Sequence, residues 1–247
     1  MSSFSTLNTA LSGLQAHKRA IDVIGHNISN VNSDGYTRRQ VILEPSVGMQ
    51  QSSRYDSKFS WNNLGVNIAG VNRIRDAFLD QKARATIAGS AQAERLDSIL
   101  SGIETVFPEP SDTSIAAQLS AFWNSFADAA NSPDSIPQRS AVLAQASSVV
   151  ASLRQASADL KTQHTDVTGQ LQMMVERVNS VAQQIADMNV QIRSANVSGM
   201  DSGDLEDKRD LMIDELTKLT GATARPTEYG QIDIMLGGSS LVAGDKI

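Results

Sequence analysis

The sequence of 247 residues predicts a mainly α-helical protein. We expect an elongated helical bundle or coiled coil with long heptad helices, a small β element after the first helix, and the start of a β-hairpin near the C-terminal end. Apolar residues recur at spacings of three and four along most of the chain, which is the period of one helical face. Only 4% of residues are aromatic, which suits long helices packed through modest side chains.

The composition also narrows the function classes. A net charge of -6 gives no concentrated basic face for nucleic acid, and Arg38 with Arg39 do not form one alone. The chain has no cysteine, which excludes disulfides, thiolate metal sites and a cysteine nucleophile. Neither a secretory signal pattern nor an apolar run long enough to cross a bilayer is present. We therefore expect no nucleic-acid or membrane partner, and either a cytosolic protein or one exported by a dedicated machine.

Residues 1–34 are predicted to form an amphipathic assembly helix that ends near Gly35, which can adopt the left-handed conformation. Such a helix is marginal in water without a partner for its apolar face. No obvious partner lies within the sequence, so we expect it to pack on other molecules and to be mobile in an isolated subunit. The apolar residues that define this assembly stripe are Leu7, Leu11, Leu14, Ile21, Ile24, Ile28 and Val31.

Residues 35–72 are predicted to form an irregular connector containing a β-hairpin. Short β-favouring runs at Arg38–Leu43 and Leu64–Val71 flank a loop rich in Gly, Ser and Asn. We expect Gly35 and Tyr36 to set the bend between the first helix and the rest of the chain. The loop carries three aromatic residues: Tyr55, Phe59 and Trp61.

Residues 73–221 are predicted to form a domain of long helices. Helical spacing runs from Arg73 to about Thr105, returns in a short segment that starts at Ile115, and is strongest over Leu143–Ala195. That last stretch keeps a heptad register, which requires partner helices. We favour an intramolecular core over an assembly surface, because further helices of the same chain, Arg73–Thr105 among them, can cover it. A final helix is expected to end at Gly221.

Residues 222–247 are predicted to begin a β-rich element. Ile232, Ile234 and Leu236 alternate before a Gly-Gly pair, and an apolar run restarts at Leu241. The sequence stops at Ile247, inside this expected hairpin, so we expect it to be a truncated piece of a longer protein.

No catalytic, cofactor or metal site is predicted. The three histidines are far apart in the sequence and lack metal-ligand spacing. Four acids, Glu206, Asp207, Asp210 and Asp214, partly share a helical face that could hold a divalent cation. A solvated face is the favoured interpretation, because acids suit a helix start and basic residues lie among them. We do not expect an enzyme.

The stretch Ser12–Arg39 combines an amphipathic helix, the core His26-Asn27-Ile28-Ser29-Asn30 and the turn Gly35-Tyr36-Thr37-Arg38. In identities, spacing and position it resembles the N-terminal signature of flagellar rod, hook and hook-associated proteins. His26 departs from the asparagine that is common there in the family. The residues that carry this first motif are Asn27, Ile28, Asn30, Gly35, Tyr36 and Arg38.

A second stretch, Leu205–Leu216, resembles the L-x-D-x-R-D-x-L pattern of the hook-associated proteins of the hook-filament junction. That group is favoured within the wider family by this stretch, by the turn Gly35–Arg38, by the segments Gly65–Ile68 and Arg73–Phe78, and by the long heptad region. Its key residues, the second motif, are Asp207, Arg209, Asp210 and Leu211.

The resemblance implies a structural subunit outside the cell, exported unfolded through the flagellar type III apparatus without a cleaved signal. It implies that subunits form a ring at the tip of the hook, with the hook protein and the second hook-associated protein as neighbours. An export chaperone is a further partner that the resemblance is compatible with. The family's first helix pairs with a C-terminal helix to line the axial tube, and this sequence contains no such helix.

Two alternatives stay open at this stage. The first is another flagellar axial protein: the second junction protein, a rod subunit or the hook protein. The second is a cytosolic coiled-coil scaffold with no flagellar role.

Overall fold

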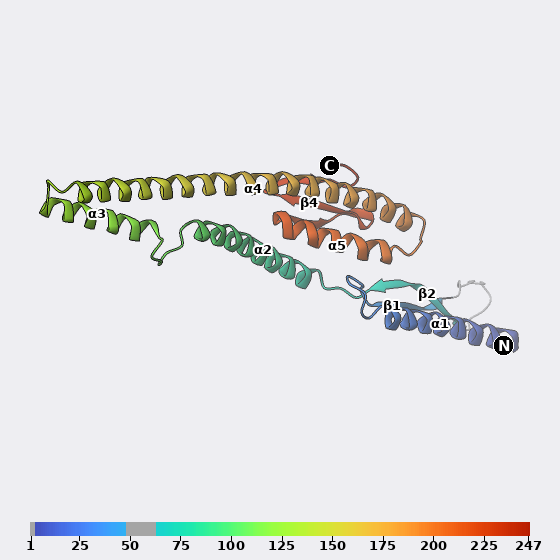
Figure 1. Cartoon of the computed structure of the whole chain (residues 1–247). Coiled ribbons are helices and arrows are strands. Elements are labelled where there is room, and N and C mark those ends of the chain that lie inside the picture. The colour runs from blue at the N-terminus through green and yellow to red at the C-terminus, as the bar shows by residue number, and fades with distance from the viewer. Residues whose placement is uncertain (1–2, 48–62) are drawn as a thin grey trace. The chain divides into compact units, whose positions relative to one another are not determined.

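The computed structural model describes residues 3–47 and 63–247 and is mainly helical, as predicted (Figure 1). The chain divides into two compact units. The first unit combines residues 1–85 with 181–247, and the second comprises residues 86–180. Among the described residues, no helix is long and apolar enough to cross a membrane.

The first unit begins with helix α1, Ser3–Ser29, and an antiparallel hairpin of strands β1, Arg39–Val47, and β2, Asn63–Arg73. The hairpin pairs Arg39 with Arg73 at its open end and carries two register irregularities. The predicted β element is therefore confirmed. The predicted loop aromatics Tyr55, Phe59 and Trp61 lie outside the described residues.

Helix α1 lies against this hairpin, so the expectation that it has no partner within the sequence is wrong. Ala16 is 1% exposed, and Val23, about two turns later on the same face, is 8% exposed. The Ser12 hydroxyl on that face accepts a hydrogen bond from the Val66 amide at 3.2 Å. A side chain at Gly65 would collide with Ser12, and Gly65 has a φ of 101°, so only glycine allows this approach. The sequence pattern concealed this contact because the docking face is narrow and made of small residues.

The helices that follow are α2, Ala77–Val106, α3, Ile115–Asn131, and α4, Ile136–Val197. Helix α2 begins later than the predicted Arg73, because strand β2 extends to that residue. The carboxylate of Asp76 accepts the amide hydrogens of Phe78 and Leu79, which is an N-terminal cap. Ser114 caps α3 in the same manner by accepting from the Ala117 amide.

In the second unit, α3 lies beside the first turns of α4 (Figure 1), where the hydroxyl of Ser152 donates to Gln118. Gln163 of α4 reaches the Ile99 carbonyl of α2. The covered face of α4 contains Val149 and Ala156, one residue before the predicted heptad positions.

The predicted intramolecular core of α4 is therefore only half correct. Its C-terminal part is confirmed, because Val178, Val181, Ile185, Ile192 and Ala195 are buried. In the N-terminal part, α2 and α3 contact the neighbouring face instead. The predicted core residues left exposed there are Leu143, Val150, Leu153, Leu160 and Leu171.

The first unit is completed by α5, Gly203–Thr220, and a three-stranded antiparallel sheet of β3, Thr223–Pro226, β4, Ile232–Leu236, and β5, Ser239–Val242. A short 3-10 turn, η1, Glu228–Gly230, joins the first two of these strands. Helix α5 ends at Gly221 in the left-handed conformation, as predicted. The largest fully buried apolar side chains here are those of Val181, Ile185, Ile192, Ile213, Leu216, Ile234 and Val242.

Candidate assembly site

The two sequence motifs, about 170 residues apart, meet within the first unit. Gly35 follows α1 with a φ of 75°, and a β-carbon placed on it would collide with the Leu211 side chain of α5. The absence of a side chain therefore lets the turn after α1 approach α5 closely. This supports the interpretation of Gly35 as the residue that fixes the turn, and identifies Leu211 as its neighbour.

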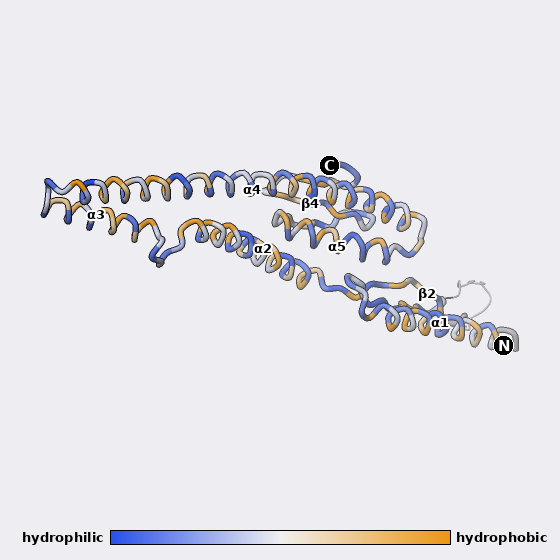
Figure 2. Tube along the Cα trace, viewed as in Figure 1, coloured by the Kyte–Doolittle hydropathy of each residue, from blue (hydrophilic) through white to orange (hydrophobic). Residues whose placement is uncertain are grey.

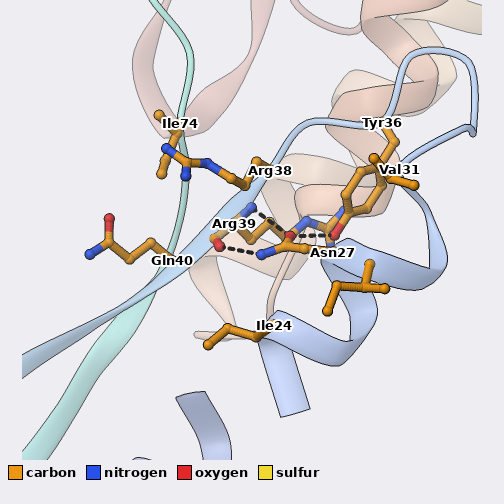
Figure 3. A pocket seen from close by; sticks show the side chains of 9 residues that line it. Ile24, Asn27, Val31, Tyr36, Arg38, Arg39, Gln40 and Ile74 are labelled. Carbon is orange, nitrogen blue, oxygen red and sulfur yellow. Dashed lines mark hydrogen bonds between the residues drawn. The ribbon is translucent and has the colours of Figure 1, made fainter. Parts of the chain in front are cut away.

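Asn27, in the last turns of α1, holds the start of β1 (Figure 3). Its Nδ2 donates to the Arg39 carbonyl at 2.8 Å, and its Oδ1 accepts from the Arg39 amide at 2.9 Å. The same Oδ1 accepts from the Tyr36 hydroxyl at 2.8 Å. Because that hydroxyl proton is committed to Asn27, His26 Nδ1, 3.1 Å away, must be the donor to the Tyr36 oxygen. Asn27 thus satisfies both main-chain groups of Arg39.

Arg39 and Arg73 face each other across the open end of the β1–β2 hairpin. Like charges directly opposite each other destabilise a strand pair unless anions lie between them. Asp207 of α5 supplies one: one carboxylate oxygen accepts from Arg39 at 3.0 Å and the other from Arg73. Arg39 also pairs with Asp204 at 2.5 Å. Ion pairs therefore hold the open end of the hairpin against α5.

The remaining ion pairs extend along the same face of α5. Arg73 also pairs with Glu206 and Asp210, at 2.8 and 2.6 Å. Arg75, just beyond β2, pairs with Asp210 and with Asp80. Arg84 of α2 pairs with Asp214 at 2.7 Å. We refer to these arginines and acids as the ion-pair network: Arg39, Arg73, Arg75, Arg84, Asp80, Asp204, Glu206, Asp207, Asp210 and Asp214.

The interpretation of these acids as a solvated face is wrong for Asp207 and Asp210, because each is only 7% exposed and paired with arginine. The acids recur every three or four residues and so share one side of α5. Sequence reasoning missed their partners because the arginines lie in the β1–β2 hairpin and at the start of α2, more than 120 positions away from the acids. Within the described ranges, no group of three or more metal-ligating side chains could hold an ion.

Burial disfavours the charged carboxylate of Asp207, but hydrogen bonds from Thr37 and Arg39 and the charge of Arg73 outweigh it. Together they hold the pKa of Asp207 below its ordinary value. Burial likewise opposes the charge on Arg73, yet its bonds to Asp210 and Glu206 raise its pKa. Both shifts favour the charged forms of Asp207 and Arg73.

Arg209, the basic residue of the second motif, points away from the network. It is 3% exposed and donates to the Asn189 side chain of α4 at 3.0 Å and to the Gly230 carbonyl at 2.6 Å. Asn189 in turn binds the Ile232 and Gly244 carbonyls. Burial lowers the pKa of Arg209. Arg209 therefore orders the polar contact between α4, α5 and the sheet.

A pocket of about 560 Å³ opens beside the end of α1 (Figure 3). Ile24, Ile28 and Val31 of the assembly stripe line it, together with Ile74 and the exposed Arg38 of the first motif. Asn30, the remaining motif residue, donates to the His26 carbonyl and helps to end α1. The pocket is thus continuous with the stripe and has an unburied cation at its rim.

The assembly stripe is open to solvent along α1. Its seven residues range from 49% exposed at Leu11 to 74% at Val31, and apolar residues recur along the helix (Figure 2). Large exposed apolar surfaces on one side of a helix mark interaction sites. Helix α1 therefore has two faces, one docked on the hairpin and one without cover among the described residues.

Family models match most of the chain. The model of the flagellar hook-associated protein FlgK helical domain matches residues 100–247, and that of the flagella basal body rod protein matches residues 7–37. The first motif lies in or next to the second of these ranges, and the second motif lies within the first.

Curated relatives give the same result. Flagellar hook-associated protein 1 of Bacillus subtilis is 31% identical over 88% of the chain, and that of Salmonella typhimurium is 29% identical over 97%. The chain spans 43% of the length of each relative. In fold, it resembles the flagellar hook junction protein FlgK from Burkholderia pseudomallei. The TM-score is 0.51 at 24% identity, over 67% of this chain and 28% of that one.

Proposed function

Because the chain belongs to the FlgK family of flagellar hook-associated proteins, a family of structural proteins and not of enzymes, we propose that its protein forms the junction between hook and filament. The observation that carries this proposal is the structure of α1. One face is fixed to the subunit's own hairpin, while the assembly stripe stays open. A subunit that joins two tubes needs such a helix, rigidly attached and uncovered on one side.

The stripe and the adjoining pocket are the proposed packing surface for neighbouring subunits. In this proposal, copies of the protein form a ring, with the hook protein on one side and the second hook-associated protein on the other. The subunit reaches this position outside the cell through the flagellar export apparatus, with or without an export chaperone. The four-part division at residues 34, 72 and 221 describes the proposed roles: assembly helix, connector, helical domain and β-rich element.

A deletion strain tests this function against its alternatives. We expect cells that lack the gene to build complete hooks without attached filaments, and the intact gene to restore the filaments. Missing hooks would instead assign the protein to the rod or hook, and normal motile filaments would favour the cytosolic scaffold. Electron microscopy of isolated hook-basal bodies separates these outcomes.

Two adjacent positions of α1 test the stripe itself. Leu14 is a stripe residue, 68% exposed, and Gln15 is exposed beside it but outside the stripe. Leu14→Glu should abolish complementation, because a charge would be buried at the packed interface. Gln15→Glu introduces the same charge and should complement fully. Equal complementation by both variants would count against the stripe as the packing surface.

A further inference from the structure

The first unit contains a continuous chain of contacts from α1 to α5 that passes through a single residue, Arg39. Its main-chain amide and carbonyl are both held by Asn27 of α1. Its guanidinium is held by Asp204 and Asp207 of α5. In the described part of the chain, Asn27 and these acids have no hydrogen bond to each other. Any effect of one on the other must therefore pass through Arg39 or through the chain around it.

We propose that Arg39 is a positioning residue that couples the direction of the assembly helix to helix α5, so that the carboxylates of α5 set how firmly α1 is held. This deepens the proposed function, because it names the link between the assembly helix and the helical body of the subunit.

The geometry of the guanidinium supports a rigid link. Arg39 is 7% exposed, and its Nε is buried without an acceptor among the described residues. Only the carboxylates and the Tyr36 ring, whose centroid lies 5.4 Å from the guanidinium carbon, orient the charged end. A guanidinium that lost its carboxylates could not stay buried, since an unpaired buried charge is strongly unfavourable.

The contact with Gly203 and the position of Tyr36 leave the Arg39 side chain little freedom. Gly203, the first residue of α5, lies directly against the guanidinium, and a β-carbon there would be 2.8 Å from its central carbon. The Tyr36 ring that contacts the guanidinium also donates its hydroxyl hydrogen to Asn27. Displacement of the Arg39 side chain would therefore disturb the strand start, Tyr36 and Asn27 together.

Amide hydrogen exchange of the 247-residue chain, measured by NMR, tests the coupling. The Arg39 amide reports on α1, since its hydrogen is bonded to Asn27. Asp207→Asn should accelerate exchange of that amide by about tenfold or more, although position 207 does not contact Asn27. Asp204→Asn, at a residue whose side chain is 69% exposed, should act in the same direction but less strongly and preserve the fold.

Asp214→Asn is the matched control, because it removes the same charge from the same face of α5 but affects Arg84 instead. It should leave Arg39 exchange unchanged. The Val66 amide, bonded to Ser12 at the other end of the docked face, carries the general loss of stability, and its exchange should accelerate clearly less than that of the Arg39 amide in Asp207→Asn. Unchanged Arg39 exchange in Asp207→Asn, or equal acceleration in Asp214→Asn or at Val66, would overturn the coupling.

Coupling is reciprocal, which gives an independent readout. Asn27→Ala should release Arg39 and so raise the measured pKa of Asp207 towards its ordinary value. An unchanged pKa would contradict the proposal. These measurements use the isolated chain, so they can fail while the filament test of the proposed function succeeds, or the reverse.

Discussion

The two compact units of the chain differ in how they are held together. The first unit contains every large side chain that is fully buried among the described residues, and it adds the ion-pair network between the hairpin and α5. In the second unit α3 has no buried residue, and only Val149, Ala156 and Val178 represent the apolar core. Helix burial, and not helix length, decides stability, because an isolated amphipathic helix is marginal in water.

The difference also separates two kinds of exposed apolar surface. On α1 the exposed stripe belongs to a helix that its other face anchors within the first unit. On α4 the exposed residues belong to a helix whose neighbouring face is covered by α2 and α3 only lightly. We therefore expect the second unit to open more readily than the first when the chain is destabilised.

Replacing a buried leucine with alanine should cause the largest loss of unfolding free energy. It is also the most direct test of the difference between the two units. Leu216 is 0% exposed in the first unit, and Leu153 is 50% exposed in the second. We expect Leu216→Ala to lower the free energy of unfolding by about 3 kcal/mol, because it leaves a cavity. Leu153→Ala should lower it by less than about 0.5 kcal/mol. Urea unfolding measures both, and similar losses would mean that Leu153 is covered in solution.

Acid should weaken the first unit through its network. The folded pKa of Asp207 is depressed, so its contribution is complete above the unfolded value of about 4 and is lost as pH falls through the folded pKa. We expect unfolding free energy to fall below about pH 4, and Asp207→Asn to cost about 2 kcal/mol at about pH 7. The variant should show a flatter pH dependence between about pH 2 and 5. Parallel pH curves for wild type and variant would contradict this assignment.

Gly35 tests the turn that brings the two motifs together. Gly35→Ala should destabilise the chain by about 1–2 kcal/mol, since alanine disfavours a φ of 75° and would collide with Leu211. Leu211→Ala in the same chain should recover the steric part and leave the backbone part. Gly89→Ala is the control, because a β-carbon there would meet nothing within 4 Å, and it should be neutral or slightly stabilising. Thermal unfolding of these variants distinguishes the contributions.

Local patterns predicted most of the fold, and long-range partners account for what they missed. The alternation at Ile232–Leu236 and the glycine at 221 placed the sheet and the end of α5 correctly, because both depend on neighbouring residues. The heptad over Leu143–Ala195 predicted the helix but only half of its covered face, since periodicity does not identify the partner.

The site shows the same limit. Both motifs can be identified in the sequence, but only the structure shows that they contact each other at Gly35 and Leu211. The spacing of the α5 acids predicts one helix face, and the sequence alone favours solvent as its surroundings. The sequence signal that could have corrected this is Arg39 and Arg73, cations in two β-favouring segments that pair with each other in the hairpin and so require acids nearby.

The smallest expected loss of stability is at the exposed end of the ion-pair network, the pair of Arg84 and Asp214. It tests whether exposed and buried pairs of the network contribute differently. The side chains of Arg84 and Asp214 are 15% and 38% exposed, whereas that of Asp207 is 9% exposed. Asp214→Asn should therefore cost less than about 1 kcal/mol at low salt, because water screens the pair. At about 1 M NaCl the loss should nearly vanish, since the screening length falls to about 3 Å. Urea unfolding at both salt concentrations measures this, with Asp207→Asn as the buried counterpart that should keep most of its cost. If salt reduced the stability loss of both variants equally, water would screen the ion pairs of Asp207 as fully as those of Asp214. Burial would then not explain why Asp207 contributes more to stability.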